Sequence, residues 1–492
     1  MSAKFRPEGA IVGDTIPFFW EGTYHVFYLK GPDTHDIPLR FKTSWGHLVS
    51  TDLVTWEEMP VGLELGPEGS PDATGVWHGT VVERDGIFHL LYTGYNSKAP
   101  DYPQTICHAT SKDLIQWEKD ANNPVLLPDP REYEPRDWRD PWVFWNEDEG
   151  RYWMLITARR RTGPFLKRGC LVLATSSDLS QWKVDSTFWA PDLTFTYEAS
   201  QLFQWGNTWY LLWNDFSMPM AMYYRIGDSA RGPWRTPRAE RFDGTYFYGG
   251  KTVKDDVRHL VFAWLPTRFG ENDDGYWEWG GDLVIPREIT KQADSSFAFK
   301  CPSQITDSYS KTLPISIEPR LGEWNYDSQN RNIVGERDDG LGYVIIPVQV
   351  NDFLFEVRLR LEVGTSAAGI LFKTEPNFSQ GYLLRFDPAY HRVVIDHWPL
   401  PVHRPWSAPP QSVFPPGTPM SKGPSPLVEQ PFDFAYGDFI KCQLFVSDST
   451  IQCFVGDRVV LTYRVYRDVG APLGLFLQGG KVQFEDVKLK IS

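Results

Sequence analysis

Short apolar segments recur along the first half of the chain at a nearly constant interval. Each has six or seven residues, and successive segments start about 50 to 65 residues apart. The segments are Tyr24–Leu29, Phe88–Thr93, Tyr152–Ala158, Trp209–Asn214 and His259–Leu265. β-Rich units repeated at this spacing are typical of propeller blades, which must stack in a ring to bury their faces. Residues 1–290 are therefore predicted to form a five-bladed β-propeller around a central funnel.

A polar phrase accompanies these segments. It reads Thr51–Trp56, returns as Lys112–Trp117 and Ser177–Trp182, and has a less regular fourth copy that ends at Trp234. The aspartates at its second position are Asp52, Asp113 and Asp178. Because they recur in each well-kept repeat, they are expected to hold a turn in each blade and are excluded from catalysis.

The pattern changes after residue 290. Residues 291–313 are weakly patterned and are predicted to link two domains. Beyond them apolar and polar residues alternate, as in Phe355–Val363, and several short runs of this kind predict a β-sandwich over residues 314–492. A proline-rich insertion, residues 399–431, is not expected to join a sheet ladder. It is interpreted as a surface flap or as an arm that contacts another subunit, which leaves a homodimer open.

Composition narrows the classes of function. The formal net charge of −14 argues against nucleic acid and anionic membranes as partners. The five cysteines are scattered singly, which favours reduced thiols over a disulfide framework or a zinc site. The sequence shows no apolar signal segment near Met1 and no run long enough to span a bilayer, so a cytoplasmic location is expected.

One position in each repeat is expected to face the funnel, because the strand before the recurrent segment should be the innermost of its blade. This position lies ten to twelve residues before each segment. The residues found there are Asp14, His78, Asp140, Glu198 and Phe247. Three of the five repeats thus carry a carboxylate at the equivalent place, and the three are expected to meet at one rim of the funnel.

Converging carboxylates repel one another, so a function that needs them is favoured. Glycoside hydrolysis uses one carboxylate at the anomeric carbon and another, with a raised pKa, to protonate the leaving oxygen. Structural roles remain as alternatives. Asp14 follows a glycine and could form a turn, Asp140 could pair with its neighbour Arg139, and Glu198 could be a buried structural acid.

At these residues the chain resembles glycoside hydrolase family 32, the β-fructosidases. The resemblance covers nearly the whole chain and combines several motifs in order. They are Tyr24–Tyr28, Trp45–His47 with Ser50, Asp52 and Trp56, Arg139–Pro141, Phe242–Gly244 with Phe247 and Tyr248, Gly281–Leu283, Pro286–Glu288, Phe454–Val455, Leu461–Tyr466 and Leu473–Phe476.

The resemblance implies a retaining mechanism; this chemistry needs no cofactor, and the sequence shows no metal-ligand spacing. Asp14 would be the nucleophile, Asp140 would stabilise the transition state and Glu198 would be the acid/base, with the two working carboxyls roughly 5–5.5 Å apart. The neighbours of these residues depart from the family. Asp14 stands in Val12–Pro17 without the usual asparagines, Leu29 replaces a glutamine and His78 replaces a serine. An altered furanoside, an unusual linkage or lost activity would each fit these departures.

Substrate contacts are expected from Trp45, Trp77, His78, Arg139 and Tyr248. The leading hypothesis is a β-fructofuranosidase that acts on short oligosaccharides. The alternatives are a fructosyltransferase, an inverting arabinanase-like furanosidase on the same fold, and a sugar-binding propeller that has lost catalysis.

Overall fold

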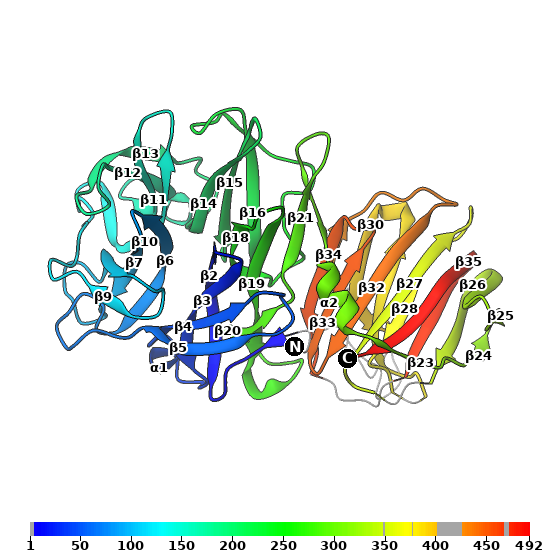
Figure 1. The fold of residues 1–492 in the computed structure, drawn as a ribbon. Helices are drawn as coiled ribbons and strands as arrows, with labels where there is room; N and C mark the ends of the chain where they lie inside the picture. Colours follow the sequence, from blue (N-terminus) through cyan, green and yellow to red (C-terminus); the bar gives the residue numbers. More distant parts are fainter. Residues whose placement is uncertain (1–3, 348–349, 376, 401–425, 467–471) are drawn as a thin grey trace, which may run out of the picture.

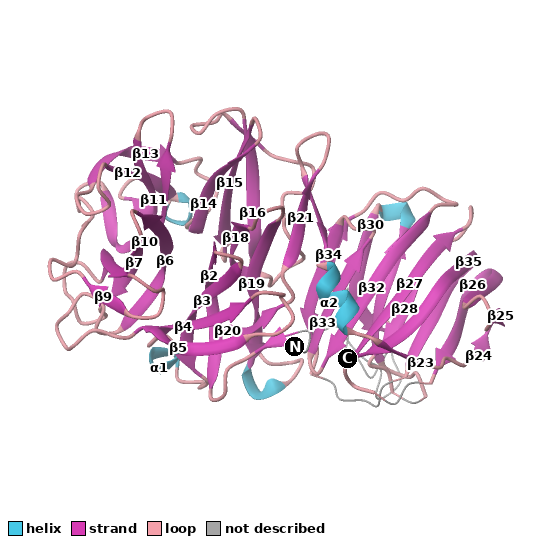
Figure 2. Ribbon diagram, in the orientation of Figure 1, coloured by secondary structure: helices cyan, strands magenta, loops and turns pink. Residues whose placement is uncertain are grey.

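The computed structural model describes residues 4–347, 350–375, 377–400, 426–466 and 472–492. Strands dominate these residues, and the α-helices are α1 (Ile37–Arg40) and α2 (Ser303–Ser308) (Figure 2). Short 3-10 turns occur at Phe165–Lys167, Phe269–Glu271 and Pro388–Tyr390. The strands form two groups that lie side by side, one from the first 300 residues and one from the rest (Figure 1).

Three sheets of the first group are four-stranded antiparallel meanders in which each strand pairs with the next. The first contains β6 (Gly75–Arg84), β7 (Ile87–Tyr95), β8 (Gln104–Ser111) and β9 (Trp117–Lys119). The second contains β10 (Tyr133–Asn146), β11 (Arg151–Arg160), β12 (Gly169–Ser176) and β13 (Lys183–Trp189). The third contains β14 (Glu198–Trp205), β15 (Thr208–Asp215), β16 (Ala221–Gly227) and β17 (Trp234–Arg235).

The fourth sheet joins the beginning and the end of this group. It contains β1 (Lys4–Phe5), β2 (Ala10–Trp20), β3 (Thr23–Pro32), β4 (Ser44–Ser50), β5 (Glu57–Leu63), β18 (Tyr248–Lys254), β19 (His259–Arg268), β20 (Trp277–Val284), β21 (Arg287–Lys291) and β22 (Phe297–Lys300). β2 meets β20 at the single pair Val12–Gly281, and β1 also pairs with β20. This near-closed arrangement fits a propeller whose first and last repeats are hydrogen-bonded together.

The repeated aspartates hold turns, as the sequence predicts. The Oδ1 atom of Asp178 accepts hydrogen bonds from the backbone N–H groups of Ser180 and Gln181, both at 2.8 Å. Asp52 and Asp113 make the same pair of bonds to the residues two and three positions further on. The leucine after each aspartate has a positive φ of 61–66°, so these bonds stabilise a left-handed residue at the same place in three repeats.

The second group is a sandwich organised by two long strands, β26 (Asn332–Ile346) and β35 (Leu473–Ile491). They pair with each other on both sides of a bend in β35 at Gly479 and Gly480, whose φ angles are 61° and 81°. Before the bend β35 also pairs with β28 (Ala367–Phe372), and after it with β27 (Phe353–Leu361). The remaining strands are β23 (Lys311–Leu313), β24 (Glu318–Leu321), β25 (Glu323–Asp327), β29 (Gly381–Asp387), β30 (Arg392–Trp398), β31 (Val428–Pro431), β32 (Phe439–Ser447), β33 (Thr450–Val455) and β34 (Val459–Arg464).

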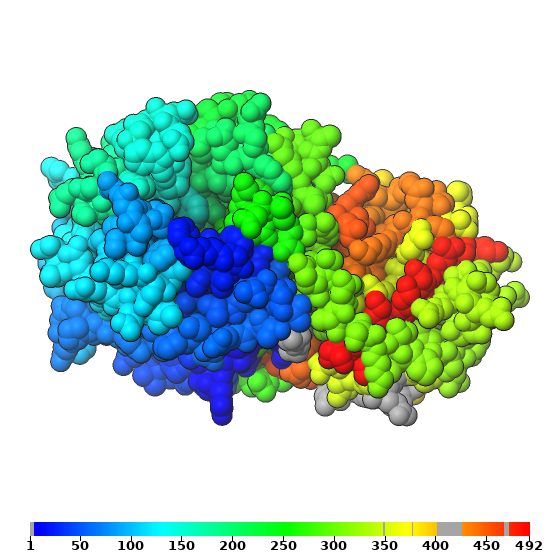
Figure 3. All heavy atoms as spheres, in the orientation of Figure 1, coloured from blue at the N-terminus to red at the C-terminus, as the bar shows by residue number. Residues whose placement is uncertain are grey.

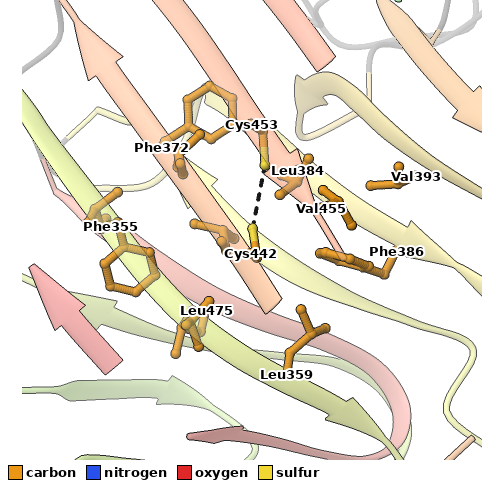
Figure 4. Close-up of a cluster of buried hydrophobic side chains, with 14 of the residues drawn as sticks. Phe355, Leu359, Phe372, Leu384, Phe386, Val393, Cys442, Cys453, Val455 and Leu475 are labelled. Atoms are coloured by element: carbon orange, nitrogen blue, oxygen red, sulfur yellow. Dashed lines mark hydrogen bonds between the residues drawn. The ribbon is translucent and has the colours of Figure 1, made fainter. Parts of the chain in front are cut away.

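The sandwich has its own apolar core, to which most of its strands contribute (Figure 4). Two cysteines lie in this core, and the Sγ atoms of Cys442 and Cys453 are 3.4 Å apart. All five cysteines are buried free thiols, which confirms the prediction of reduced cysteines. Burial raises the pKa of the Cys107, Cys170 and Cys301 thiols to about 12, so these side chains pack as neutral groups.

A buried ion pair and buried hydrogen bonds fasten the sandwich to the propeller, and the two lobes are in contact along one side of each (Figure 3). Asp282 of β20 pairs with Arg464 of β34 and also accepts a hydrogen bond from Arg6 at 2.7 Å. A second buried pair, Arg287 with Asp243 at 2.8 Å, lies within the propeller, and Asp243 reaches the sandwich by accepting the backbone N–H of Thr462 at 2.8 Å. The carboxylates of both pairs are fully buried, so each needs its cation.

The structure describes all of the expected link between the domains and only the ends of the proline-rich insertion. Residues 291–313, the expected link, carry β22, α2 and β23, and β22 extends the propeller sheet through β21. The proline-rich insertion lies largely outside the described residues, at 401–425. Its end was wrongly excluded from a ladder, because β31 pairs with β30 as the edge strand of its sheet, where a proline is tolerated. No helix in the described part of the chain is long and apolar enough to cross a membrane.

Candidate active site

A cavity of about 420 Å³ opens at the centre of the propeller. The first strand of every repeat reaches it: β2 brings Asp14, β6 His78, β10 Asp140, β14 Glu198 and β18 Tyr248. Four of these five are the residues at the predicted slots. In the last repeat the slot residue Phe247 is buried and does not line the cavity, and its neighbour Tyr248 does.

A β-bulge in each of these strands explains why the slots converge. The register shifts between Val12 and Thr15, and equivalent shifts occur in the other four first strands. They lie at Val76–Gly79, Arg139–Trp142, Glu198–Gln201 and Tyr248–Lys251. Because a bulge bends its strand and redirects a side chain, five bulges at one level turn five side chains toward the axis.

Arg139 joins two of the three carboxylates. Its Nη2 donates to Glu198 Oε1 at 2.9 Å, and its Nε lies 3.7 Å from Asp140 Oδ2. The opposite oxygen of Glu198 accepts a hydrogen bond from the Tyr248 hydroxyl at 2.5 Å. Asp140 has a φ of 57° and is held by two bonds, from its N–H to Thr93 Oγ1 and from the Ala199 N–H to its Oδ2. Glu198 and Asp140 are thus fixed on both sides of one guanidinium group.

Asp14 lies beside this pair. Its Oδ1 accepts a hydrogen bond from Trp264 Nε1 at 2.9 Å, and it also abuts Gly249, where a Cβ atom would lie 2.1 Å from that oxygen. Gly249 has a φ of 61° and directly follows Tyr248, which holds Glu198. A glycine is therefore required where the chain passes between the two carboxylates.

The environment keeps protons on this cluster. Burial, together with the charges of Glu198 and Asp140, raises the pKa of Asp14 to about 8, against the opposing effects of the Trp264 hydrogen bond and of Arg139. Burial also raises the pKa of Glu198 and of Asp140, against the opposing effect of Arg139. Facing carboxylates cannot all ionise at neutral pH, so at least one of the three is protonated.

A buried lysine that was not expected from the sequence, Lys251, lies close to the cluster. Lys251 is 1% exposed, and its Nζ donates to Gly79 O at 3.0 Å and lies 4.8 Å from the centre of the Trp142 ring. Burial lowers its pKa to about 7, while Asp140 and Asp14 act in the opposite direction. Lys251 ends the bulge of the fifth repeat, three residues after Tyr248, and this place is defined by the register of β18 rather than by a sequence motif.

The expected substrate contacts are only partly at the cavity. Trp77, His78, Arg139 and Tyr248 line it, and Trp45 does not. The Trp45 ring is fully buried and its Nε1 donates to Trp77 O at 3.0 Å. Trp45 lies on β4, the third strand of its repeat, which is one reason why it does not reach the axis. His78 is also fully buried, with its Nε2 3.3 Å from Thr15 O.

Three aromatic rings, Phe41, Trp77 and Trp279, form a wall of the cavity that the sequence analysis did not find as a unit. Phe41 stacks on Trp279 with ring centres 4.8 Å apart and lies 6.3 Å from Trp77. Trp279 also fills the space beside Gly13, where a Cβ atom would lie 2.5 Å from the indole ring. Gly13 thus stands before Asp14 where the family has an asparagine, and a tryptophan from β20 occupies the space beside it.

Asp14→Asn is expected to stabilise the folded protein while it removes the charged form of the carboxyl. A folded-state pKa raised to about 8 means that stability present at about pH 4 is lost as the pH rises toward about 8. Asparagine does not titrate, so the variant does not lose this stability. In thermal unfolding, its melting temperature should exceed that of the parent protein by a margin that grows from about pH 5 to about pH 8. Asp178→Asn, in an exposed turn, is the matched control and should give no such gain. A variant less stable than the parent at about pH 8 would contradict the assignment of a raised pKa.

Residues 7–300 match the model of the N-terminal domain of glycosyl hydrolases family 32. An insoluble β-fructofuranosidase isoenzyme of Arabidopsis thaliana is 29% identical over 56% of this chain and 52% of its own length. The sucrose-6-phosphate hydrolase of Zymomonas mobilis is 27% identical over 55% of this chain and 56% of its own. The chain therefore spans about half the length of these curated relatives.

The likeness in fold covers more of the chain. The exo-inulinase of Aspergillus awamori superposes with a TM-score of 0.73 at 21% identity, over 100% of this chain and 98% of that one. The match to the family model covers more than half of the 492 residues. The chain belongs to glycoside hydrolase family 32.

Proposed function

We propose that the protein is a retaining glycosidase that removes terminal fructofuranosyl units from short oligosaccharides. The observation that carries this proposal is the convergence of Asp14, Asp140 and Glu198, from three separate strands, on one cavity of about 420 Å³. The family and the activities named for its relatives support the same reaction. We also divide the propeller into five blades, because the five bulged strands are equivalent and β2 joins β20 by one register pair only.

In the proposed mechanism each carboxyl has a separate task. Glu198 donates its proton to the glycosidic oxygen while the Asp14 carboxylate attacks the anomeric carbon, so that the bond to the leaving group breaks and a fructosyl ester forms. Water then attacks the same carbon, Glu198 takes its proton, and the ester bond to Asp14 breaks. Asp140, held by Thr93 and Ala199, accepts hydrogen bonds from sugar hydroxyls.

The neighbouring groups fit these tasks. Tyr248 and Arg139 keep the side chain of Glu198 in place, and the raised pKa of Glu198 suits an acid. The Trp264 N–H favours the ionised form of Asp14. When Asp14 and Glu198 share a single proton, the productive form has that proton on Glu198 and leaves Asp14 charged. No cofactor enters this scheme.

A hydrolysis screen tests the proposal. It would compare sucrose, inulin-type and levan-type oligosaccharides, fructose dianhydrides and aryl arabinofuranosides, with product analysis at low and high substrate concentration. We expect release of fructose from at least one fructofuranoside. Fructosylated sugars as the main product would instead identify a transferase, and tight binding without any released sugar would identify a binding protein and overturn the proposal. The cytoplasmic location, the homodimer and the domain division at residues 290 and 314 stay predictions from the sequence.

A further inference from the structure

The charges around the cavity decide which substrates it accepts. Five carboxylates line it: Asp14, Asp137, Asp140, Glu198 and Glu278. Among the described residues, Arg139 is the one cationic side chain in its lining. A negatively charged group on the substrate would therefore meet an excess of like charge.

Arg139 has no nitrogen left to bind an anion. Its Nη1 donates to Asp137 Oδ1 at 2.8 Å and to Gln104 Oε1 at 3.2 Å. Its Nη2 and Nε donate to Glu198 Oε1 at 2.9 and 3.3 Å. An entering phosphate would have to break these bonds, which hold the proposed acid in place.

Glu278 extends the negative charge beyond the three converging carboxylates. It lies on β20, directly before the wall residue Trp279, and its side chain is 6% exposed. Its Oε1 lies 2.8 Å from Nδ1 of His35, whose side chain is half exposed. Glu278 is neither the proposed acid nor the proposed nucleophile. Its charge can therefore be removed by substitution while both reacting carboxyl groups are kept.

Most of the remaining lining is apolar or aromatic. Phe41, Trp77 and Trp279 form the aromatic wall, and Phe216, Met220 and Trp277 also contribute. Phe216 is 46% exposed, so an apolar surface continues outward from the cavity. Aromatic faces of this kind pack against the C–H face of a sugar ring or against an aryl group, and neither contact needs a charge.

Building on the proposed function, we infer that the protein accepts uncharged fructofuranosides and rejects phosphorylated ones, with Glu278 as a residue that enforces the choice. This sets it apart from the activity named for its Zymomonas mobilis relative. Like charges placed together in a partly buried site lower affinity by orders of magnitude, which gives selectivity by repulsion rather than by an added contact.

The test compares sucrose with sucrose 6-phosphate on the full-length protein. We expect kcat/KM for sucrose to exceed that for sucrose 6-phosphate by at least about 100-fold. Glu278→Gln should narrow the ratio by roughly 5- to 10-fold through faster turnover of the phosphorylated sugar. Glu323→Gln, an exposed site on β25 of the sandwich, removes the same charge far from the cavity lining and should leave the ratio unchanged.

Calorimetric binding of the two sugars to the Glu198→Gln variant keeps the inference testable if neither sugar is hydrolysed. Tighter binding of sucrose supports it, whatever the fate of the proposed activity. Equal or tighter binding of sucrose 6-phosphate, or equal turnover of the two sugars by the parent protein, would overturn it and leave the fructosidase proposal standing. Release of no sugar from any fructofuranoside would overturn the proposed activity alone.

Discussion

Glu198→Gln is expected to lower kcat/KM for sucrose and fructan oligosaccharides by about 10²–10⁴-fold, the contribution typical of a general acid. Glutamine keeps an oxygen that can accept the hydrogen bond from Arg139, so the side chain should stay in place. It has no proton to give, and the alcohol leaving group of a natural fructoside cannot depart without one.

The loss should depend on the leaving group. In an aryl fructofuranoside with an acidic phenol, the phenolate leaves without being protonated. Glu198→Gln should therefore slow the cleavage of this substrate much less than the cleavage of sucrose. Steady-state and burst kinetics on the two substrates measure the difference. Glu323→Gln serves as the control and should behave as the parent protein. Equal losses for both substrates would assign Glu198 a structural role.

Asp282→Ala is expected to destabilise the folded protein by about 3–5 kcal/mol, the cost of removing one partner from a buried ion pair. The variant leaves Arg464 and Arg6 without their carboxylate at the contact between propeller and sandwich. Burial alone would raise the pKa of Asp282, but Arg464, Arg6 and Lys4 outweigh it and hold the pKa at about 2. The stability from this pairing is therefore present above about pH 4 and is lost as the pH falls through about 2.

Urea unfolding followed by intrinsic tryptophan fluorescence measures this loss. The matched control is Glu336→Ala, which breaks the exposed pair with Lys481 and should cost far less, because solvent screens that pair. The double variant Asp282→Leu with Arg464→Met should regain part of the loss, because it buries no uncompensated charge within the pair. If Asp282→Ala costs no more than Glu336→Ala, the pair does not fasten the two lobes.

The sequence was most informative where a local pattern repeats. The spacing of the apolar segments located the innermost strands, and the offset before each segment located Asp14, His78, Asp140 and Glu198 at the cavity. The recurring aspartates were interpreted correctly as turn residues because an Asx turn depends only on its near neighbours.

The sequence was less informative where position depends on register or on distant packing. Tyr248 lines the cavity in place of the expected Phe247; both lie ten to twelve residues before His259, and an offset counted in residues cannot tell which of two neighbours faces the axis. Trp279 comes from β20 and covers Gly13 only because the two ends of the propeller meet. Trp45 was misplaced because a family motif carries no information about which face of its strand is buried.

The most direct test of the account is the identity of the residue that carries the sugar. In the Glu198→Gln variant an aryl fructofuranoside should still form the fructosyl ester, and its hydrolysis should be slow because no base activates water. Peptide mapping by mass spectrometry after a brief reaction should find one added fructosyl unit, on Asp14. A fructosyl unit on another residue, or turnover with inverted configuration and no labelled peptide, would contradict the account.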